Sequence, residues 1–268
     1  MTRQRAAVLG SPVSHSRSPL LHRACYSLLG RPECTYDAIE VPAGTLAEFW
    51  GHLDNTWMGI SLTMPLKEEV LPFLAAVDPV AAEVGAANTV VFTDDGPIGM
   101  NTDVIGLVEV LRPRISDLTS EGMTVIGSGA TARSAVAAGI RLGLRELTVL
   151  CRRPDAVTEM QYQFPGITLT HQSWPQTGTT VVPGAVVVST IPATVALPLT
   201  PTPGQYLLDV NYPQPPGLQA WTAAGGLGED GLAMLVQQGV AQTLLFTGEV
   251  VDASGLQALV AAATEAIR

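Results

Sequence analysis

Short runs of β-branched or apolar residues alternate along the chain with longer, alanine-rich amphipathic segments. This alternation is typical of βα repeats that build a parallel sheet, so the predicted fold class is α/β. In the first third of the chain the pattern predicts four strands, near residues 6–9, 35–39, 59–62 and 89–92. It also predicts three helices there, near residues 19–29, 45–51 and 66–71.

A linking helix is predicted over residues 101–111, and a second pattern begins at Met123. There a strand, a glycine turn, a helix and a further strand follow one another, which is the opening of a mononucleotide-binding unit. Later strands are predicted near residues 166–169, 185–189 and 206–210. Two terminal helices, near residues 232–246 and 256–267, fit either of two domains.

The composition excludes several classes of protein. The 268 residues carry a formal charge of -10, which argues against a nucleic-acid partner, because binding to that backbone depends on clustered Lys and Arg. The three cysteines form no disulfide framework or metal-ligand pattern, and no apolar run is long enough for a membrane span. We therefore expect a cytoplasmic protein without metal or membrane anchor. The sequence leaves open whether it is a monomer or a homodimer.

A glycine-rich turn follows the strand that starts at Met123. Its sequence, GSGATA, matches the dinucleotide-binding pattern and opens a helix, as the mechanism requires. The first glycine permits a tight turn, the second lets the backbone approach a pyrophosphate, and the final alanine keeps helix and strand close. The predicted cofactor-binding residues here are Gly127, Ser128, Gly129, Ala130, Thr131 and Ala132.

Two arginines, Arg152 and Arg153, follow the next strand, at the position that selects between NAD and NADP. An acidic residue at this position accepts a hydrogen bond from the ribose of NAD, whereas planar guanidinium groups suit the 2'-phosphate of NADP. The pair therefore predicts NADP(H) as the cofactor. A solvated surface loop is the simpler alternative.

Lys67 is the only lysine among fourteen basic residues, the other thirteen being arginine. Lysine can exchange a proton where arginine stays charged, so the exception points to chemistry. Lys67 also follows a predicted strand, and ligand crevices lie at the carboxyl ends of strands. Asp103 begins the linking helix and is either a helix cap or a partner in a site.

A serine-rich loop, residues 14–19, lies between the first strand and the first helix. Hydroxyl groups and backbone N-H groups near a helix N-terminus suit a carboxylate. Ser18 before Pro19 is also explained as an ordinary N-cap.

Six ordered blocks together resemble the shikimate dehydrogenase (shikimate/quinate dehydrogenase) family over essentially the whole chain. The blocks are residues 10–22 (GSPVSHSRSPLLH), 61–67 (SLTMPLK), 85–89 (GAANT), 101–103 (NTD), 127–132 (GSGATA) and 231–238 (GLAMLVQQ). The resemblance implies a substrate-binding domain over residues 1–102, completed by residues 238–268, and a Rossmann-like NADP-binding domain over residues 103–237. It implies reversible, NADPH-dependent reduction of 3-dehydroshikimate to shikimate, a step of chorismate and aromatic amino acid biosynthesis.

The resemblance also implies roles for individual residues. Lys67 and Asp103 would be catalytic, and which of them moves the proton stays open. Gly231 would line the nicotinamide pocket. The residues that would contact the substrate are Ser16, Ser18, Thr63, Asn88, Tyr212 and Gln238.

Four positions depart from the commoner family pattern, namely Arg23, Ser61, Ala130 and Cys151. They put substrate preference and affinity in doubt, because Ser61 is shorter than the usual Asn and because Cys151 leaves the 2'-phosphate to the two arginines. The alternatives are a quinate or aminoshikimate dehydrogenase of the same family, or a non-catalytic NADPH-binding sensor.

Overall fold

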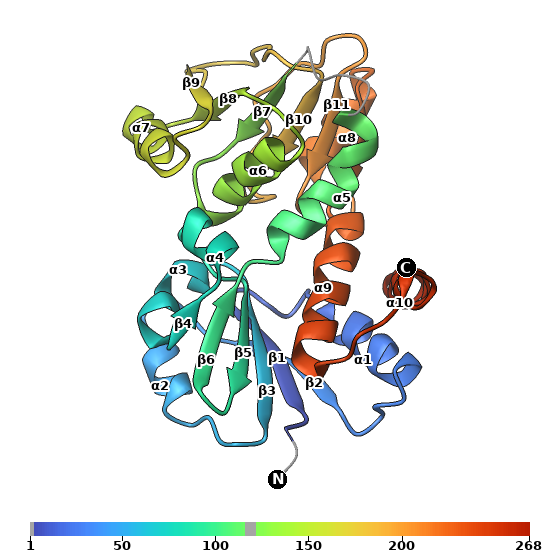
Figure 1. The fold of residues 1–268 in the computed structure, drawn as a ribbon. Coiled ribbons are helices and arrows are strands. Elements are labelled where there is room, and N and C mark those ends of the chain that lie inside the picture. The colour runs from blue at the N-terminus through green and yellow to red at the C-terminus, as the bar shows by residue number, and fades with distance from the viewer. Residues whose placement is uncertain (1–2, 116–121) are drawn as a thin grey trace. The chain divides into compact units, whose positions relative to one another are not determined.

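The computed structural model describes residues 3–115 and 122–268 (Figure 1). The chain divides into two compact units, which are described separately. Unit 1 comprises Met1–Ile105 and Leu235–Arg268, and unit 2 comprises Gly106–Met234. The assignment of substrate to the first domain and cofactor to the second stays a prediction at this point, because compactness alone says nothing of ligands.

Unit 1 contains a six-stranded sheet with the order β2-β1-β3-β5-β6-β4. β1 is parallel to both β2 and β3, whereas β5 runs antiparallel to β3 and to β6. The strands are β1 (Arg5–Gly10), β2 (Thr35–Glu40), β3 (Trp57–Leu62), β4 (Ala76–Val77), β5 (Thr89–Thr93) and β6 (Gly96–Met100). The helices are α1 (Ser18–Leu28), α2 (Leu46–Trp50), α3 (Leu66–Glu69), α4 (Pro79–Val84), a 3-10 helix (Leu71–Phe73) and α10 (Ala253–Ile267).

The sheet of unit 1 is buried on both faces. Because successive strand residues point to opposite sides, Ala7 and Leu9 of β1 belong to one core with residues of α2 and α3, while Ala6 and Val8 belong to another. Helices α1 and α9 (Leu232–Thr247) cover the second face, where Phe246 packs. The terminal helix α10 packs on α1 in the same unit. This answers the question of which domain the last helix joins.

The sequence pattern was wrong about part of the unit 1 sheet, which is mixed rather than parallel. The hairpin partner β6 and the short elements β4 and α4 were not predicted. In β6 the sequence GPIGM combines glycine and proline, which are depleted in strands. The helix predicted over residues 66–71 ends at Glu69 and is followed by a 3-10 helix that contains Pro72.

Unit 2 contains a fully parallel six-stranded sheet with the order β12-β11-β10-β7-β8-β9. Numbered from its first strand this is the order 3-2-1-4-5-6 of the Rossmann fold, read from the other edge. The strands are β7 (Met123–Ile126), β8 (Glu146–Cys151), β9 (Thr168–Ser173), β10 (Val186–Ser189), β11 (Tyr206–Asp209) and β12 (Leu227–Asp230). The helices are α6 (Ala130–Arg141), α7 (Pro154–Gln163) and α8 (Pro216–Ala223), with α5 (Asp103–Ile115) and α9 joining the two units.

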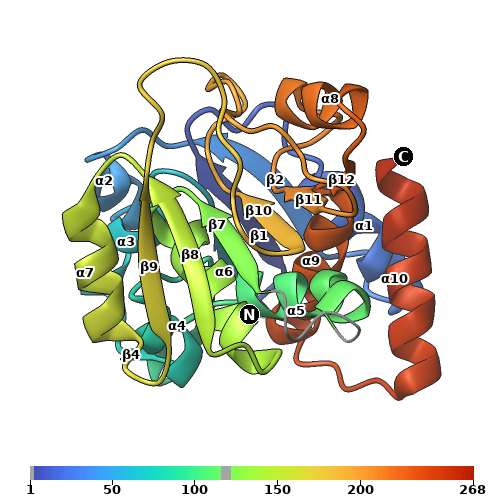
Figure 2. The same ribbon diagram turned by 90° about the horizontal axis from the view of Figure 1, so that it is seen from above.

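Helices cover both faces of the unit 2 sheet, and Figure 2 shows α6 and α8 on opposite sides. Gly139 of α6 lies so close to Met123 and Leu147 that a Cβ would be within 2.9 Å of both side chains. On the other face Trp221 of α8 packs in a core with Ile126. The α/β class and the Rossmann-like unit are thereby confirmed, although α7, α8 and β12 were not predicted. No helix in the described part of the chain is long and apolar enough to cross a membrane.

Candidate active site

A buried ion pair joins Lys67 to Asp103. Lys67 lies in α3, directly after β3, and Asp103 is the first residue of α5. The Lys67 Nζ to Asp103 Oδ2 distance is 2.6 Å, and only 13% and 7% of the two side chains are exposed. A pair removed from water to this degree needs further hydrogen bonds to be stable.

Asp103 is not the cap of α5. The Asn101 side-chain oxygen accepts from the Val104 backbone N-H at 3.4 Å, so Asn101 supplies the cap. The Asp103 carboxylate is used differently, because its second oxygen accepts from Asn88 Nδ2 at 2.8 Å. Of the two readings that the sequence left open, the structure favours the partner in a site.

Asn88 connects this pair to the other polar side chains around it. Its Nδ2 lies 3.0 Å from Thr102 Oγ1 and 3.4 Å from Gln238 Oε1, in addition to the contact with Asp103. Gln238 comes from α9, and its own Nε2 donates to the Leu235 carbonyl at 3.0 Å. The structure therefore brings Lys67, Asp103, Asn88 and Gln238 together, although α3 and α9 are far apart along the chain.

The loops that carry the remaining predicted substrate residues of unit 1 lie at the carboxyl ends of β1 and β3. Thr63 follows β3, and a Cβ on Gly10 would lie 2.2 Å from Thr63 Cγ2, so only glycine permits this approach. The Ser11 N-H donates to the Met64 carbonyl at 3.0 Å and ties the two loops together. Ser16 lies in the loop after β1, beside the one that leads to Lys67.

Ser18 is not the N-cap that its position before Pro19 suggested. It is the first residue of α1, and Arg17 occupies the N-cap position without a capping hydrogen bond from its side chain. The Ser18 side chain is buried, and its N-H donates to Ser16 Oγ at 3.3 Å. Pro19 has no N-H, and the Leu20 N-H donates to the Arg17 carbonyl at 3.1 Å. An anion at this helix end would therefore depend on the hydroxyl groups of Ser16 and Ser18. The roles of Ser16, Ser18 and Thr63 toward a ligand stay predictions.

The buried imidazole of His22 in unit 1 is not a proton donor. Burial lowers its pKa to about 3, so the ring is neutral at physiological pH. Its Nδ1 lies 2.8 Å from Thr243 Oγ1, and the ring stacks on Tyr36 at a centroid distance of 3.9 Å. His22 is therefore not a candidate for an acid at physiological pH, and the proton-transfer role of Lys67 and Asp103 stays a prediction.

In unit 2 the glycine turn has the geometry that a pyrophosphate requires. Gly127 has a φ of +111°, and a Cβ there would lie 2.4 Å from Thr190 Oγ1. Gly129 has no protein atom within 4 Å of a Cβ position, and as the N-cap of α6 it leaves the helix end without a side-chain cap. Ala132 is fully buried. The open space at Gly129 and the uncapped helix fit a bound dinucleotide.

Arg152 and Arg153 follow β8 and are both exposed. Among the described residues neither guanidinium forms an ion pair, so both keep their charge available to an anion. Cys151 shapes this loop, because its buried thiol donates to the Arg153 carbonyl at 3.2 Å. Burial raises the pKa of that thiol, which stays protonated and able to donate. The replacement of the usual Asn therefore has a local structural role here.

Two further predicted residues, Tyr212 and Gly231, lie beyond the carboxyl ends of β11 and β12. A Cβ on Gly231 would lie 2.1 Å from the Val210 carbonyl oxygen, so this position requires glycine for packing alone. The buried Asp209 accepts two hydrogen bonds from Asn211, at 3.0 Å and 2.7 Å, and so holds the segment that leads to Tyr212. The roles of Tyr212 near substrate and of Gly231 near nicotinamide stay predictions.

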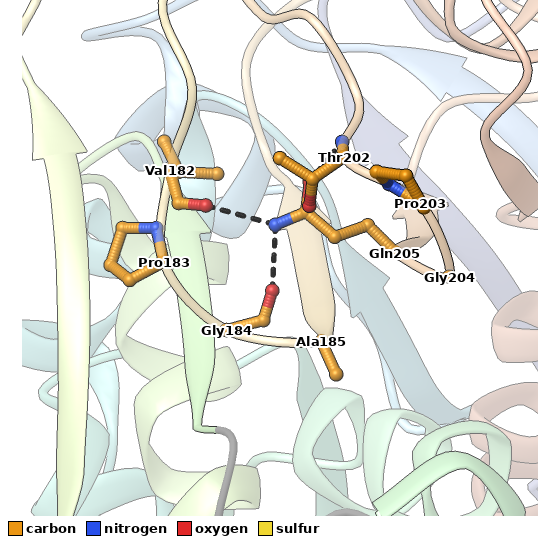
Figure 3. A pocket seen from close by; sticks show the side chains of 8 residues that line it. All are labelled: Val182, Pro183, Gly184, Ala185, Thr202, Pro203, Gly204 and Gln205. Atoms are coloured by element: carbon orange, nitrogen blue, oxygen red, sulfur yellow. Dashed lines mark hydrogen bonds between the residues drawn. The ribbon is translucent and has the colours of Figure 1, made fainter.

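A hollow of about 550 Å³ in unit 2 is a structural feature rather than a cofactor site (Figure 3). It lies at the amino ends of β10 and β11, whereas ligands of such sheets bind at the carboxyl ends. Its polar side chain is already occupied, because Gln205 Nε2 donates to the carbonyls of Val182 and Gly184 at 2.9 Å and 2.7 Å.

The sequence reasoning missed several polar residues that surround the ion pair. Ser61 was considered only for its shorter side chain, and its hydroxyl accepts from Tyr36 and donates to Gln242. Thr89 and Thr102 both contact the Asn88 amide. Thr89 and Thr102 lie beside motif residues and could have been noted, whereas nothing in the local sequence singles out Gln242.

Comparison with known proteins gives consistent matches. The model of the shikimate dehydrogenase substrate binding domain matches residues 8–90. The shikimate dehydrogenase (NADP(+)) of Thermosynechococcus vestitus is 33% identical over 260 residues, covering 92% of this chain and 91% of that protein. The crystal structure of Mycobacterium tuberculosis shikimate dehydrogenase is 35% identical with a TM-score of 0.80, covering 97% and 99% of the two chains. The Thermus thermophilus enzyme in complex with NADP(H) and shikimate is 28% identical with a TM-score of 0.73, covering 97% and 99%.

A Rossmann-like unit with an open glycine turn, joined to a unit that holds a buried lysine and carboxylate, defines the class of NADP-dependent dehydrogenases. Within that class the matches extend over nearly the whole chain at up to 35% identity. The chain belongs to the shikimate dehydrogenase family.

Proposed function

We propose that this chain catalyses the reversible, NADPH-dependent reduction of 3-dehydroshikimate to shikimate, a step of aromatic amino acid biosynthesis. The observation that carries the proposal is the buried cluster of Lys67, Asp103, Asn88 and Gln238. An ammonium, a carboxylate and two amides in one place can hold several hydroxyl groups and move one proton, as a polyhydroxylated ring with a carbonyl requires.

When bound, NADPH would supply the hydride that the carbonyl carbon needs, and the carbonyl oxygen would take a proton to become a hydroxyl group. We assign delivery of that proton to Lys67 Nζ, which becomes a neutral amine and is reprotonated from solvent. Asp103 orients the ammonium, because both of its oxygens act as acceptors, one for Lys67 and one for Asn88. If Asp103 itself carried and donated the proton, one of its oxygens would no longer be free to accept from Lys67 or from Asn88.

The residues of unit 2 fit the cofactor. The backbone of Gly127–Ala132 at the N-terminus of α6 would hold the pyrophosphate, and Arg152 and Arg153 would hold the 2'-phosphate. Ser16 and Ser18 are proposed to bind the substrate carboxylate, and Thr63 and Tyr212 to contact its ring. The cytoplasmic location and the monomeric or homodimeric state stay predictions from the sequence.

The test is NADP+ reduction followed by the absorbance of the reduced nicotinamide, with shikimate and quinate as parallel substrates and NAD+ as the parallel cofactor. We expect turnover with shikimate and NADP+ to exceed each of the other combinations. Faster turnover of quinate would assign the chain to a quinate dehydrogenase. Tight NADPH binding with no turnover of either substrate would mean a sensor and would contradict the proposal.

A further inference from the structure

A continuous chain of buried hydrogen bonds leads from β2, an edge strand of the unit 1 sheet, to the Lys67–Asp103 pair. Tyr36 of β2 donates to Ser61 Oγ of β3 at 2.7 Å, and Ser61 donates to Gln242 Oε1 of α9 at 2.8 Å. Gln242 Nε2 donates to Thr89 Oγ1 of β5 at 2.9 Å. Thr89 donates to Asn88 Oδ1 at 2.7 Å, and Asn88 donates in turn to Asp103.

The strand register explains how these side chains meet. Ser61 and Thr89 are directly opposite each other on the antiparallel pair β3 and β5, so both point to the same face of the sheet. That face also carries Tyr36, and it is the face covered by α9. Gln242, which is 1% exposed, therefore reaches from the helix onto the sheet without access to solvent.

Two backbone groups fix the direction of every bond in this chain. Gln242 Nε2 also donates to the Asn88 backbone carbonyl at 3.1 Å, and a carbonyl can only accept, so the amide orientation of Gln242 is determined. Likewise the Thr102 backbone N-H donates to Asn88 Oδ1 at 2.8 Å, and this leaves the Asn88 NH2 group to face Asp103. Between these anchors Thr89 donates to Asn88 Oδ1 at 2.7 Å in preference to Thr102 Oγ1, which is farther away at 3.3 Å.

With both amides oriented, all donors point in one direction, from Tyr36 toward the Asp103 carboxylate. Donors aligned in a buried chain strengthen one another, and the effect is largest where the chain ends on a charge. The carboxylate is thereby held from one side by Asn88 and from the other by Lys67. If the chain is broken at Gln242 or Thr89, the Asn88 amide keeps the bond from the Thr102 N-H but loses or loosens the second bond to its Oδ1, the one from Thr89.

We propose that Gln242, with Thr89 and Ser61, is a positioning residue that acts together with the Thr102 N-H to hold Asn88 and Asp103 in place and so directs the Lys67 ammonium toward the substrate. The proposal rests on the proposed function, because it concerns the same proton transfer. Gln242 is not expected to touch the substrate, since its amide groups are bonded to Ser61, Thr89 and the Asn88 carbonyl.

The sharpest test is a matched pair at one position. Thr89→Val keeps the shape of the side chain and removes the hydroxyl, whereas Thr89→Ser keeps the hydroxyl. We expect Thr89→Val and Gln242→Leu to lower kcat about 10-fold, and Thr89→Ser to stay within about threefold of the wild type, because small errors in aim slow a reaction more than they weaken binding. The KM for substrate should change less than kcat, and the Kd for NADPH should not change.

Thr243→Val is the control for a purely structural effect. Thr243 is adjacent to Gln242 on α9, is fully buried, and has hydroxyl bonds to His22 and to the Gly239 carbonyl rather than to the chain. We expect this variant to lose thermal stability while keeping the wild-type kcat.

Wild-type kcat in both Thr89→Val and Gln242→Leu would overturn the inference and leave the proposed function intact. Equal losses in Thr89→Val and Thr89→Ser would also overturn it, because the hydroxyl would then not be the cause. If the wild type itself does not turn over shikimate, the proposed function fails, and the positioning role fails with it. Should Gln242→Leu not fold, the Thr89 pair decides alone.

Discussion

The two units prepare for their ligands in opposite ways. In unit 1 the proposed catalytic side chains are buried and bonded to one another, so that contacts within the protein hold Asn88, Asp103 and Lys67. In unit 2 the backbone of the glycine turn is the main feature, Gly129 faces open space, and the two arginines project into solvent. A proton-transfer step requires reacting groups in a fixed orientation, whereas a phosphate group can bind to exposed, mobile guanidinium groups.

Among the tests of ligand binding and stability, the largest effect is expected at the exposed arginines. Replacing both Arg152 and Arg153 by alanine should weaken NADPH binding roughly 10- to 100-fold, because charge-assisted hydrogen bonds to the 2'-phosphate are lost. NADH binding should hardly change. Fluorescence titration with NADPH and with NADH measures the two dissociation constants and their ratio.

Arg145→Ala is the matched control for that experiment. Arg145 is also exposed but precedes β8, at the opposite end of the strand that Arg152 follows. It should leave both affinities unchanged. If the double variant bound NADPH and NADH equally more weakly, Arg152 and Arg153 would not be the residues that bind the 2'-phosphate.

The next largest effect is a pH dependence of stability that arises from the buried His22 in unit 1. Because the pKa of His22 is about 3 in the folded protein and about 6.5 when unfolded, the unfolded state binds the proton first as the pH falls. The contribution of the neutral, buried ring to the free energy of unfolding is fully present above pH ~6.5 and decreases below it. Between pH 7 and pH 5 this group alone should lower the free energy of unfolding by about 2 kcal/mol.

Urea unfolding at the two pH values checks this prediction. A His22→Gln variant should lose most of the difference, even if it is less stable at both pH values. His52→Gln, at an exposed position of the same unit, should keep the wild-type difference. An unchanged pH dependence in His22→Gln would mean that the ring is not held neutral.

The smallest effect is expected at Gly129. An added methyl group meets no protein atom within 4 Å, so Gly129→Ala should fold with wild-type thermal stability. It should still weaken NADPH binding, about 10-fold, because the methyl group occupies the space through which the pyrophosphate approaches the backbone. Calorimetry and NADPH titration on the same sample measure both quantities.

Gly127→Ala is the comparison variant for Gly129→Ala, because it should lower stability and not only NADPH binding. There the Cβ would collide with Thr190 and the φ of +111° is unfavourable, so stability itself should fall. If Gly129→Ala bound NADPH normally, the open space beside the turn would not belong to the cofactor.

The fold could be predicted from the sequence where its signals are local. The turn from Gly127 to Ala132 and its flanking strand and helix were placed correctly, because each signal lies within about ten residues. The α4 helix was missed although Asp78 and Pro79 form a capping signal and Gly85 ends the helix in the left-handed region. The β6 strand was missed because its pairing with β5, rather than its composition, makes it a strand.

The candidate site was predictable only in part for the same reason. Lys67, Asp103 and Asn88 stand in short motifs that carry the family resemblance, so they could be named in advance. The contact from Ser61 to Gln242 joins positions 181 residues apart, and it depends on α9 returning to the sheet of unit 1. Periodicity and motif spacing contain no information about such a pair.

The central claim is that Lys67 delivers a proton within a cluster that unit 1 assembles by itself, while unit 2 binds the cofactor. The most direct measurement compares wild type and Lys67→Ala in the reduction of 3-dehydroshikimate, with NADPH affinity measured on the same samples. The account predicts that kcat falls about 100-fold or more, that KM changes little and that NADPH affinity is unchanged. Near-normal turnover by Lys67→Ala would contradict it.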